Sequence, residues 1–468
     1  MDDREDLLAS WGGPADLSAW EALMWRAEGD HRTRSSGVVV ELLDQEPDWD
    51  RLVAAHERLT KRITRLRDRV IEPPLPLVAP AWSPDPHFDM GHHLKYVQLP
   101  RGGSLVDMYA IAAEMAAAPL DLDRPPWESM LVGGLPDGRA AYLFKLHHSL
   151  SDGLGMLQLL DMTHGHSREP SEPAINATST VRRAESPWGL LANRLVTRAT
   201  AAPVELGREA VHTLGRFTGD PVRITTDAIR FGKSLRRVLK PPQAKRSPAF
   251  GEGGSRYHFI TLDVPLAALK DAAKAAEGSV NDAFLAALLG AVRMYHEANG
   301  VDVDYLPIGI PVSLRTDDDP LGGNRFAGAR FAAPVGESDP RIRIAEIHEL
   351  ISDARSEPAI GLPDLVAPVL SRLPGVLLTQ IASGMSGVLD LQASNMGAIG
   401  RTFYLAGSKV ERLYIIGPRP GVTAMVTMLS YDATCCIGIN FDPDAIVDVD
   451  GFSKNLRAGF DEVLSLGS

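Results

Sequence analysis

The chain has 468 residues, of which 44% are hydrophobic and 23% are charged, and its net charge is −12. This composition is that of a folded globular protein, and the length exceeds one ordinary hydrophobic core, so two large domains are expected. The negative charge argues against general nucleic-acid binding, which needs a positive surface to displace counterions from phosphates.

Helices and strands alternate over residues 1–165. Helical spacing, β-branched runs and turn residues predict the elements of this part of the chain. They are a helix over Leu17–Arg26 with Asp16 as its candidate cap, a strand over Gly37–Leu43, a long Arg-rich helix over Trp49–Arg69, a helix over Ser104–Ala117, and strands over Met130–Gly133 and Arg139–His148. We therefore expect an N-terminal α/β domain here.

A linker and a basic segment follow, and we assign residues 166–250 to them. Residues 167–185 are rich in Ser, Pro, Glu, Ala and Thr with little apolar periodicity, which predicts an exposed linker. From Arg182 to Arg246 there are 14 Lys and Arg against five Asp and Glu, a local balance of +9. Its helical spacing predicts a basic amphipathic crossover. This segment either packs on the first domain as a solvated helix or meets an acidic protein surface, anionic lipid or a phosphate-bearing ligand.

The α/β pattern resumes in the second half, and we assign residues 251–468 to a C-terminal domain. The predicted elements are a strand over Tyr257–Leu262, helices over Pro265–Ala276 and Asp282–Tyr295, a buried strand over Leu306–Pro311, a strand pair over Thr423–Ser430 and Thr434–Asn440, and a final helix over Phe452–Leu464. The fold class that we predict is α/β with mixed sheets.

The two cysteines and the chain ends bear on the compartment. Cys435 and Cys436 are adjacent, so neighbouring strand positions would point them to opposite faces, and neither a disulfide scaffold nor a metal site is expected. The N-terminus is acidic where a secretory signal is basic and then apolar. The longest uncharged run, 373–389, is too short and too rich in Gly, Ser and Pro to span a bilayer. We expect a cytoplasmic protein whose membrane contacts are peripheral.

The run FKLHHSLSDG at residues 144–153 is the most informative motif. On a strand, His148 shares the apolar face of Phe144 and Leu146, while His147 points to the other face. Ser149 or Ser151 is expected to cap the helix that begins near Asp152, and Gly153 lets the backbone turn tightly. The pattern thus places His148 at a strand end, above a turn.

His148 is the candidate general base. A histidine with an ordinary pKa of about 6.5 is mostly neutral at pH 7 and accepts a proton from an alcohol that attacks a carbonyl. A lone buried histidine is usually structural, but a His-His pair followed by Asp-Gly at a strand-to-helix turn favours catalysis. Asp152 either relays a proton or holds the turn through a buried ion pair with Arg315, and we favour the structural role. The second pair, His92-His93, has no following acid or glycine and is interpreted as structural.

Two competing chemistries lack their motifs. No Gly-x-Ser-x-Gly nucleophile elbow occurs, which disfavours a serine hydrolase. Gly232-Lys233-Ser234 resembles the end of a phosphate-binding loop, but Asp227 stands where the first glycine belongs. A nucleotide site is therefore not expected.

The spacing His147-His148-xxx-Asp152-Gly153 resembles the signature of CoA-dependent acyltransferases of the chloramphenicol acetyltransferase-like superfamily, which includes peptide-synthetase condensation domains. Nearly the whole chain is similar to the bacterial wax ester synthase/diacylglycerol acyltransferase family. The runs that carry this resemblance, in the family's order, are Leu17-Ser18, Arg69–Pro74, Phe88-Asp89, Pro119–Asp121, Arg124–Glu128, Ser279–Asp282, Pro311–Arg315, Gly323–Arg325, Ser394-Asn395 and Leu429–Asp432. The resemblance implies two chloramphenicol-acetyltransferase-like domains that form a pseudo-dimer with a tunnel at their interface.

The resemblance also implies roles for the site residues. It makes His148 the base, Asp152 structural and Asn281 a neighbour of the reaction centre, and it adds His147, Gly153, Arg315, Asp282, Ser394 and Asn395 as parts of the motif or support of the site. Physically, an amide at a helix start can donate to the oxyanion of an attacked thioester, and the alternative for Asn281 is that it only caps the helix.

Two departures leave the substrate preference open. The family's Pro-Leu-Trp is Pro125-Pro126-Trp127 here, and its Ser-Asn-Val-Pro-Gly-Pro run is replaced at 394–399 by Ser-Asn-Met-Gly-Ala-Ile.

The activity implied is O-acyl transfer from a long-chain acyl-CoA to diacylglycerol or a long-chain alcohol, forming triacylglycerol or wax ester. Acyl-CoA is a substrate, and no cofactor, metal or nucleic acid is expected. Two alternatives stay open: an acyltransferase that esterifies a specialised-metabolite hydroxyl, and a non-catalytic lipid-binding homologue. Peripheral contact with the inner membrane or lipid droplets is expected, and the basic crossover would hold either CoA phosphates or lipid.

Overall fold

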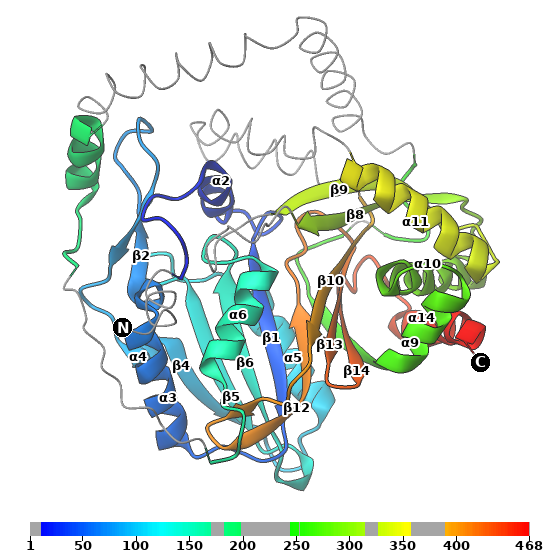
Figure 1. The fold of residues 1–468 in the computed structure, drawn as a ribbon, viewed down its shortest axis with the longest axis horizontal. Coiled ribbons are helices and arrows are strands. Elements are labelled where there is room, and N and C mark those ends of the chain that lie inside the picture. The colour runs from blue at the N-terminus through cyan, green and yellow to red at the C-terminus, as the bar shows by residue number, and fades with distance from the viewer. Residues whose placement is uncertain are drawn as a thin grey trace, which may run out of the picture.

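The computed structural model describes residues 11–169, 182–197, 244–251, 253–313, 326–356 and 389–467. Two six-stranded sheets lie side by side in the molecule (Figure 1). The first has the order β11 (Tyr404–Leu405), β12 (Ser408–Ile416), β1 (Ser36–Leu43), β6 (Ala140–His147), β5 (Trp127–Gly133), β4 (Leu94–Gln98). The second has the order β7 (His258–Pro265), β14 (Thr434–Phe441), β13 (Ala424–Tyr431), β10 (Leu391–Ile399), β8 (Tyr305–Ser313), β9 (Phe326–Pro334). The predicted mixed α/β class is confirmed.

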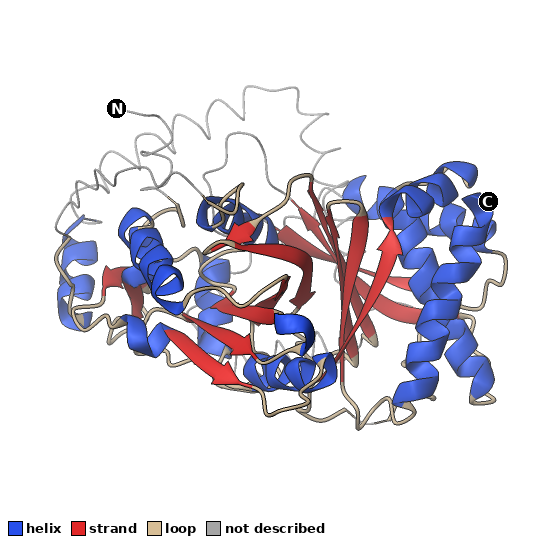
Figure 2. Cartoon of the chain, turned by 90° about the horizontal axis from the view of Figure 1, so that it is seen from below, coloured by secondary structure: helices blue, strands red, loops and turns tan. Residues whose placement is uncertain are grey.

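Helices cover both sheets. Those of the first half are α2 (Ala19–Ala27), α3 (Trp49–Arg62), α4 (Met90–His93), α5 (Leu105–Ala117) and α6 (Gly153–Thr163), and a small ribbon pairs β2 (Asp68–Ile71) with β3 (Ala81–Pro84). In the second half, α9 (Leu266–Ala275), α10 (Val280–Ala298), α11 (Pro340–Ser356) and α14 (Val449–Leu464) stack beside the second sheet (Figure 2). Helix α10 is apolar nearly all round because α9, α11 and α14 all pack against it.

The first sheet contains strands from both halves of the sequence. Strand β12 pairs antiparallel with β1, from Val38 opposite Ile416 to Leu43 opposite Val410. Strands β11 and β12, which fall within the range assigned to the C-terminal domain, therefore belong to the first sheet. Without β12, strand β1 would be an open edge of the sheet, which is a reason for the chain to return to it.

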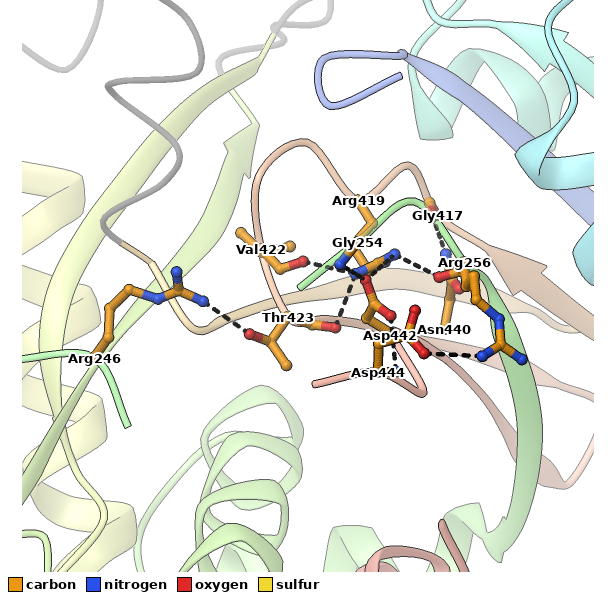
Figure 3. Close-up of polar contacts among 10 residues, drawn as sticks. All are labelled: Arg246, Gly254, Arg256, Gly417, Arg419, Val422, Thr423, Asn440, Asp442 and Asp444. Carbon is orange, nitrogen blue, oxygen red and sulfur yellow. Dashed lines mark hydrogen bonds and ion pairs between the residues drawn. The ribbon is translucent and has the colours of Figure 1, made fainter. Parts of the chain in front are cut away.

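A buried arginine anchors the loop that leads from β12 back to β13 in the second sheet (Figure 3). The Arg419 guanidinium donates to Asp442 at 3.4 Å and to the carbonyl of Arg256 at 2.7 Å, and it lies 5.0 Å above the Tyr257 ring. Both charged side chains are buried. The passage between the two sheets is thus held by a fixed polar link.

Two helix ends differ from prediction. Helix α2 is capped by Ser18, whose hydroxyl accepts from the backbone of Glu21 while the Glu21 carboxylate accepts from the backbone of Ser18, so Asp16 is not the cap. Helix α3 ends at Arg62 rather than Arg69. Residues 64–67 form a tight 3-10 turn in which Arg65 donates to the carbonyls of residues 13 and 14, and from Asp68 the chain continues as strand β2 paired with β3.

The described parts of the basic crossover contact acidic groups of the protein. Arg182 pairs with Asp68, Arg194 with Asp16 at 2.7 Å, and Arg246 with Asp390 at 3.1 Å. Residues 170–181 and 198–243 of the predicted segment lie outside the described residues, as do all but Leu389 of the run 373–389. Among the described helices, none has the length and apolar character needed to cross a membrane.

Candidate active site

The motif run lies where β6 ends and α6 begins. Strand β6 pairs with β1 up to His147 opposite Ser36, and the His148 backbone N–H then donates to the Ser35 carbonyl at 2.7 Å. The side chain of His148 is half-buried, whereas that of His147 is fully buried. The structure therefore gives the two motif histidines different environments.

Both ring nitrogens of His147 are engaged inside the protein. Its Nδ1 accepts from the backbone N–H of Ser149 at 3.0 Å and contacts the Ser149 hydroxyl at 2.7 Å. Its Nε2 lies 3.1 Å from the Glu28 carboxylate. Since a backbone N–H only donates, Nδ1 is an acceptor and Nε2 carries the proton that Glu28 accepts.

Asp152 caps helix α6. Its carboxylate accepts from the backbone N–H of Gly155 at 2.8 Å. The prediction that Ser149 or Ser151 caps the helix is therefore wrong, because the Ser149 hydroxyl is taken up by His147 and the Ser151 hydroxyl donates to the carbonyl of Asp152. Arg315, the predicted ion-pair partner, lies outside the described residues.

Gly153 is in contact with the second sheet. A Cβ at Gly153 would overlap the end of the Met396 side chain from β10. Met396 belongs to the 394–399 run that departs from the family pattern, and the Ser394 hydroxyl lies 3.5 Å from its sulfur. Asn395 makes a local turn by accepting from the backbone of Gly397, where φ is +89° and β10 shifts register against β13. The segment 394–399, whose sequence differs from the family pattern, therefore lies directly beside the motif through Met396.

Asn281 lies in the helical layer of the second half. Ser279 caps α10 and forms a capping box with Asp282, so the alternative that Asn281 is the cap is wrong. Asp282 is buried and also accepts from His348 of α11 at 2.8 Å. Among the described residues, no hydrogen bond joins Asn281 to the motif, and its oxyanion role stays a prediction.

The remaining sequence interpretations concern His93 and the cysteines. His93 is buried, its Nδ1 donates to the Trp127 carbonyl at 2.7 Å, and its ring stacks on that of Trp127. Burial lowers its pKa, so His93 is a neutral core histidine, as predicted. Cys435 and Cys436 are unbridged and buried on β14. Within the described ranges, no cluster of three or more His, Cys, Asp or Glu is arranged to hold a metal ion.

Glu28 is the site residue that the sequence interpretation missed. It follows α2 as its C-terminal cap residue, and its side chain is buried against His147. An acid at a helix C-terminus opposes the helix dipole, and this local conflict is the one signal that could have drawn attention to it.

Comparison with known proteins gives one consistent family. Residues 17–284 match the model of the wax ester synthase/diacylglycerol acyltransferase catalytic domain, and residues 322–463 match that of the WS/DGAT C-terminal domain. A Mycobacterium tuberculosis H37Rv protein named as a diacylglycerol O-acyltransferase is 37% identical over 457 residues, covering 97% of this chain and 91% of that protein.

Two solved structures share the fold. The wax ester synthase/diacylglycerol acyltransferase from Marinobacter aquaeolei VT8 superposes with a TM-score of 0.60 at 19% identity over 100% of both chains. The first condensation domain of the CDA synthetase superposes with a TM-score of 0.57 at 16% identity over 97% of both chains. The chain therefore shares the fold of both of these structures.

Proposed function

The chain belongs to the wax ester synthase/diacylglycerol acyltransferase family and is an acyltransferase, and from this premise we propose that His148 is the general base of a direct transfer from acyl-CoA to a hydroxyl group. The observation that carries the assignment is the difference between the two motif histidines. His147 is fully buried with both ring nitrogens engaged, whereas His148 is half-buried on a backbone fixed to Ser35. Of the two histidines, only His148 combines a backbone fixed by hydrogen bonds with a side chain that is partly exposed.

The chemistry balances with one titrating residue. The His148 imidazole accepts the hydroxyl proton as the alcohol oxygen forms a bond to the thioester carbonyl carbon. The tetrahedral intermediate then loses the carbon–sulfur bond, and the imidazolium returns its proton to the departing CoA thiolate. No acyl-enzyme and no further cofactor are needed. Asp152 supports this step by capping α6, and oxyanion stabilisation by Asn281 is a further part of the proposal.

The acceptor that we propose is diacylglycerol or a long-chain alcohol, and the acyl donor a long-chain acyl-CoA, giving triacylglycerol or wax ester. One observation favours a second acceptor class. Met396, at a position that departs from the family pattern, contacts Gly153 of the motif, so the shape of the acceptor site can differ from that of the family. Esterification of a specialised-metabolite hydroxyl is therefore the second candidate, and because the family is enzymatic we do not propose a non-catalytic lipid binder.

The test is CoA thiol release with a long-chain acyl-CoA and a panel of alcohols. We expect His148→Ala to lower the rate by about 10²–10⁴-fold, the usual contribution of a general base. The matched control is His92→Ala, which removes an exposed histidine of the second His-His pair and should keep the parental rate. A parental rate in His148→Ala would contradict the mechanism, and preference for a polar metabolite hydroxyl over lipid alcohols would select the second acceptor class.

We also propose a cytoplasmic location with peripheral contact at the inner membrane or lipid droplets. The support is a set of exposed apolar side chains on the helix at residues 187–197, where Trp188 is 68% exposed and Val196 64%. Flotation with anionic vesicles should bring the protein to the lipid fraction, and Trp188→Ala should weaken this. Absence of flotation at low salt would contradict the proposal.

A further inference from the structure

We infer that Glu28 is a positioning residue for His148, acting through Ser35 and His147 to fix the backbone on both sides of the base. This inference rests on the proposed function, since it takes His148 as the base. Glu28 lies 119 residues before His147 in the sequence, and its carboxylate is 2% exposed.

One branch of the contact runs through Ser35. The Glu28 carboxylate accepts the backbone N–H of Ser35 at 2.8 Å and lies 3.4 Å from the hydroxyl of Ser36. The carbonyl of Ser35 in turn accepts the backbone N–H of His148 at 2.7 Å. Glu28 therefore fixes the position of Ser35, the residue whose carbonyl accepts the His148 backbone N–H.

The other branch runs through the His147 ring. That ring accepts the backbone N–H of Ser149 through Nδ1 and donates to Glu28 through Nε2. A single imidazole thus joins the residue before His148 to the residue after it, and Glu28 fixes the ring from the far side. The Trp25 ring packs edge-on against the His147 ring at a centroid distance of 5.5 Å. The residues before and after His148 are therefore both held by hydrogen bonds to the His147 ring or from it.

The carboxylate of Glu28 is ionised at neutral pH. Burial alone would raise its pKa, but the hydrogen bonds from His147 and from the Ser35 N–H outweigh burial and hold the pKa below its usual value. Lys145 lies on the same face of β6 as His147, and its positive charge lowers the pKa of Glu28 further. The Lys145 ammonium itself donates to the carbonyls of residues 115 and 118 and pairs with Glu128. A buried negative charge beside the motif also favours the imidazolium that His148 becomes during the reaction.

The chain offers a matched control in a second buried pair. Glu41 lies on the same strand β1, is fully buried, and accepts from His164 at 2.9 Å. Glu41 lies opposite Tyr142, five positions from the Ser36–His147 pair and so roughly 17 Å along the strand. Loss of either carboxylate removes a buried acid–histidine contact, but of the two only Glu28 contacts Ser35 and His147, the residues that bond to the backbone on either side of His148.

The experiment compares Glu28→Gln with Glu41→Gln in the full chain. We expect Glu28→Gln to lower kcat on the order of 10²-fold, because a small misplacement of a catalytic group has that effect, with KM for acyl-CoA within about threefold. Its acid limb of kcat/KM against pH should move to lower pH, because the charge that favours protonated His148 is lost. Glu41→Gln should lower the thermal midpoint but keep kcat and the pH profile.

A further variant covers a failure to fold. If Glu28→Gln does not fold, Glu28→Asp keeps the charge with a shorter reach and should lower kcat without moving the acid limb. Equal kcat values and equal pH profiles for the folded Glu28 and Glu41 variants would overturn the inference. A parental rate in Glu28→Gln, with His148→Ala inactive, would overturn this inference and leave the proposed function in place. A parental rate in His148→Ala would contradict the proposed function itself.

Discussion

Asp152 shows how a motif acid acts through the backbone. Its carboxylate satisfies an N–H at the start of α6, which would otherwise have no partner inside the helix. Asp152 lies three positions after Ser149, whose backbone N–H bonds to the His147 ring. The cap therefore also fixes where the turn after His148 ends. Local backbone bonding, rather than contact with substrate, is thus one reason for an acid at this place in the motif.

Replacement of Asp152 tests the cap. Asp152→Ala should lose about 1 kcal/mol of unfolding free energy, because alanine cannot accept the N–H, whereas asparagine is as good an N-cap as aspartate. We therefore expect Asp152→Asn to lie closer to the parent than Asp152→Ala in urea denaturation. Equal losses in the two variants would show that the charge of Asp152, and not its cap, stabilises the turn.

Some residues of the site can be recognised from neighbouring positions in the sequence, and others cannot. His147, His148, Asp152 and Gly153 are recognisable because they lie within seven consecutive positions. Glu28 is not, because its contact with His147 is made across 119 residues by the pairing of β1 with β6. The contact between Gly153 and Met396 likewise depends on β10 reaching the first half, which local sequence does not encode.

Helix α6 is held at both ends. Asp152 caps its start, and at its end His164 donates through Nδ1 to the Leu160 carbonyl at 2.7 Å and through Nε2 to Glu41 of β1 at 2.9 Å. Because both acceptors are oxygens, the His164 ring carries a proton on each nitrogen. Burial alone would lower its pKa, but the charge and hydrogen bond of Glu41 outweigh burial and leave the pKa raised.

This raised pKa predicts a pH-dependent contribution to stability. The protonated His164 stabilises the fold fully below about pH 6.5, the ordinary pKa in the unfolded chain, and the contribution is lost as pH rises through the raised folded pKa. The difference in unfolding free energy between the parent and His164→Gln should therefore shrink from pH 6 to pH 9.

The control for this prediction has the opposite sign. Burial lowers the pKa of His56 to about 4, so the unfolded state gains a proton below pH 6.5 that the folded state does not take up. The difference in unfolding free energy between the parent and His56→Gln should therefore grow from pH 6 to pH 9. A His164→Gln difference that stays constant over this range would contradict the assignment of His164 as protonated.

Elements with strong local patterns were predictable. Strand β1, helices α5 and α10 and the β13–β14 pair have clear apolar periodicity, and their predicted positions agree with the structure to within a few residues. Strands β10 and β12 were not predicted. The β10 sequence carries Ser, Asn and a glycine at a register shift, and β12 gains its place from β1, some 370 positions away in the chain. Such strands are defined by their partners rather than by their own composition.

At the scale of the whole molecule, the return of β12 places a strand from the second half of the sequence in the first sheet. The loop after β12 leads into β13, and the buried Arg419–Asp442 pair holds this passage (Figure 3). Near it, Arg256 and Asp444 form a second pair whose side chains are 69% and 46% exposed. The two pairs have the same chemistry and differ in burial.

The comparison of these pairs tests the coupling of the halves. Arg419→Ala leaves a buried carboxylate without its cation and should cost about 3 kcal/mol, whereas Arg256→Ala breaks an exposed pair and should cost less than about 1 kcal/mol. All seven tryptophans lie at or before Trp188, so tryptophan fluorescence follows the first half, while far-UV circular dichroism follows both. Because β12 belongs to the first sheet and Asp442 to the second half, Arg419→Ala should lower both transitions together. A loss of helical signal at lower denaturant than the fluorescence change would show instead that the second half unfolds by itself and that the shared strand does not couple the two.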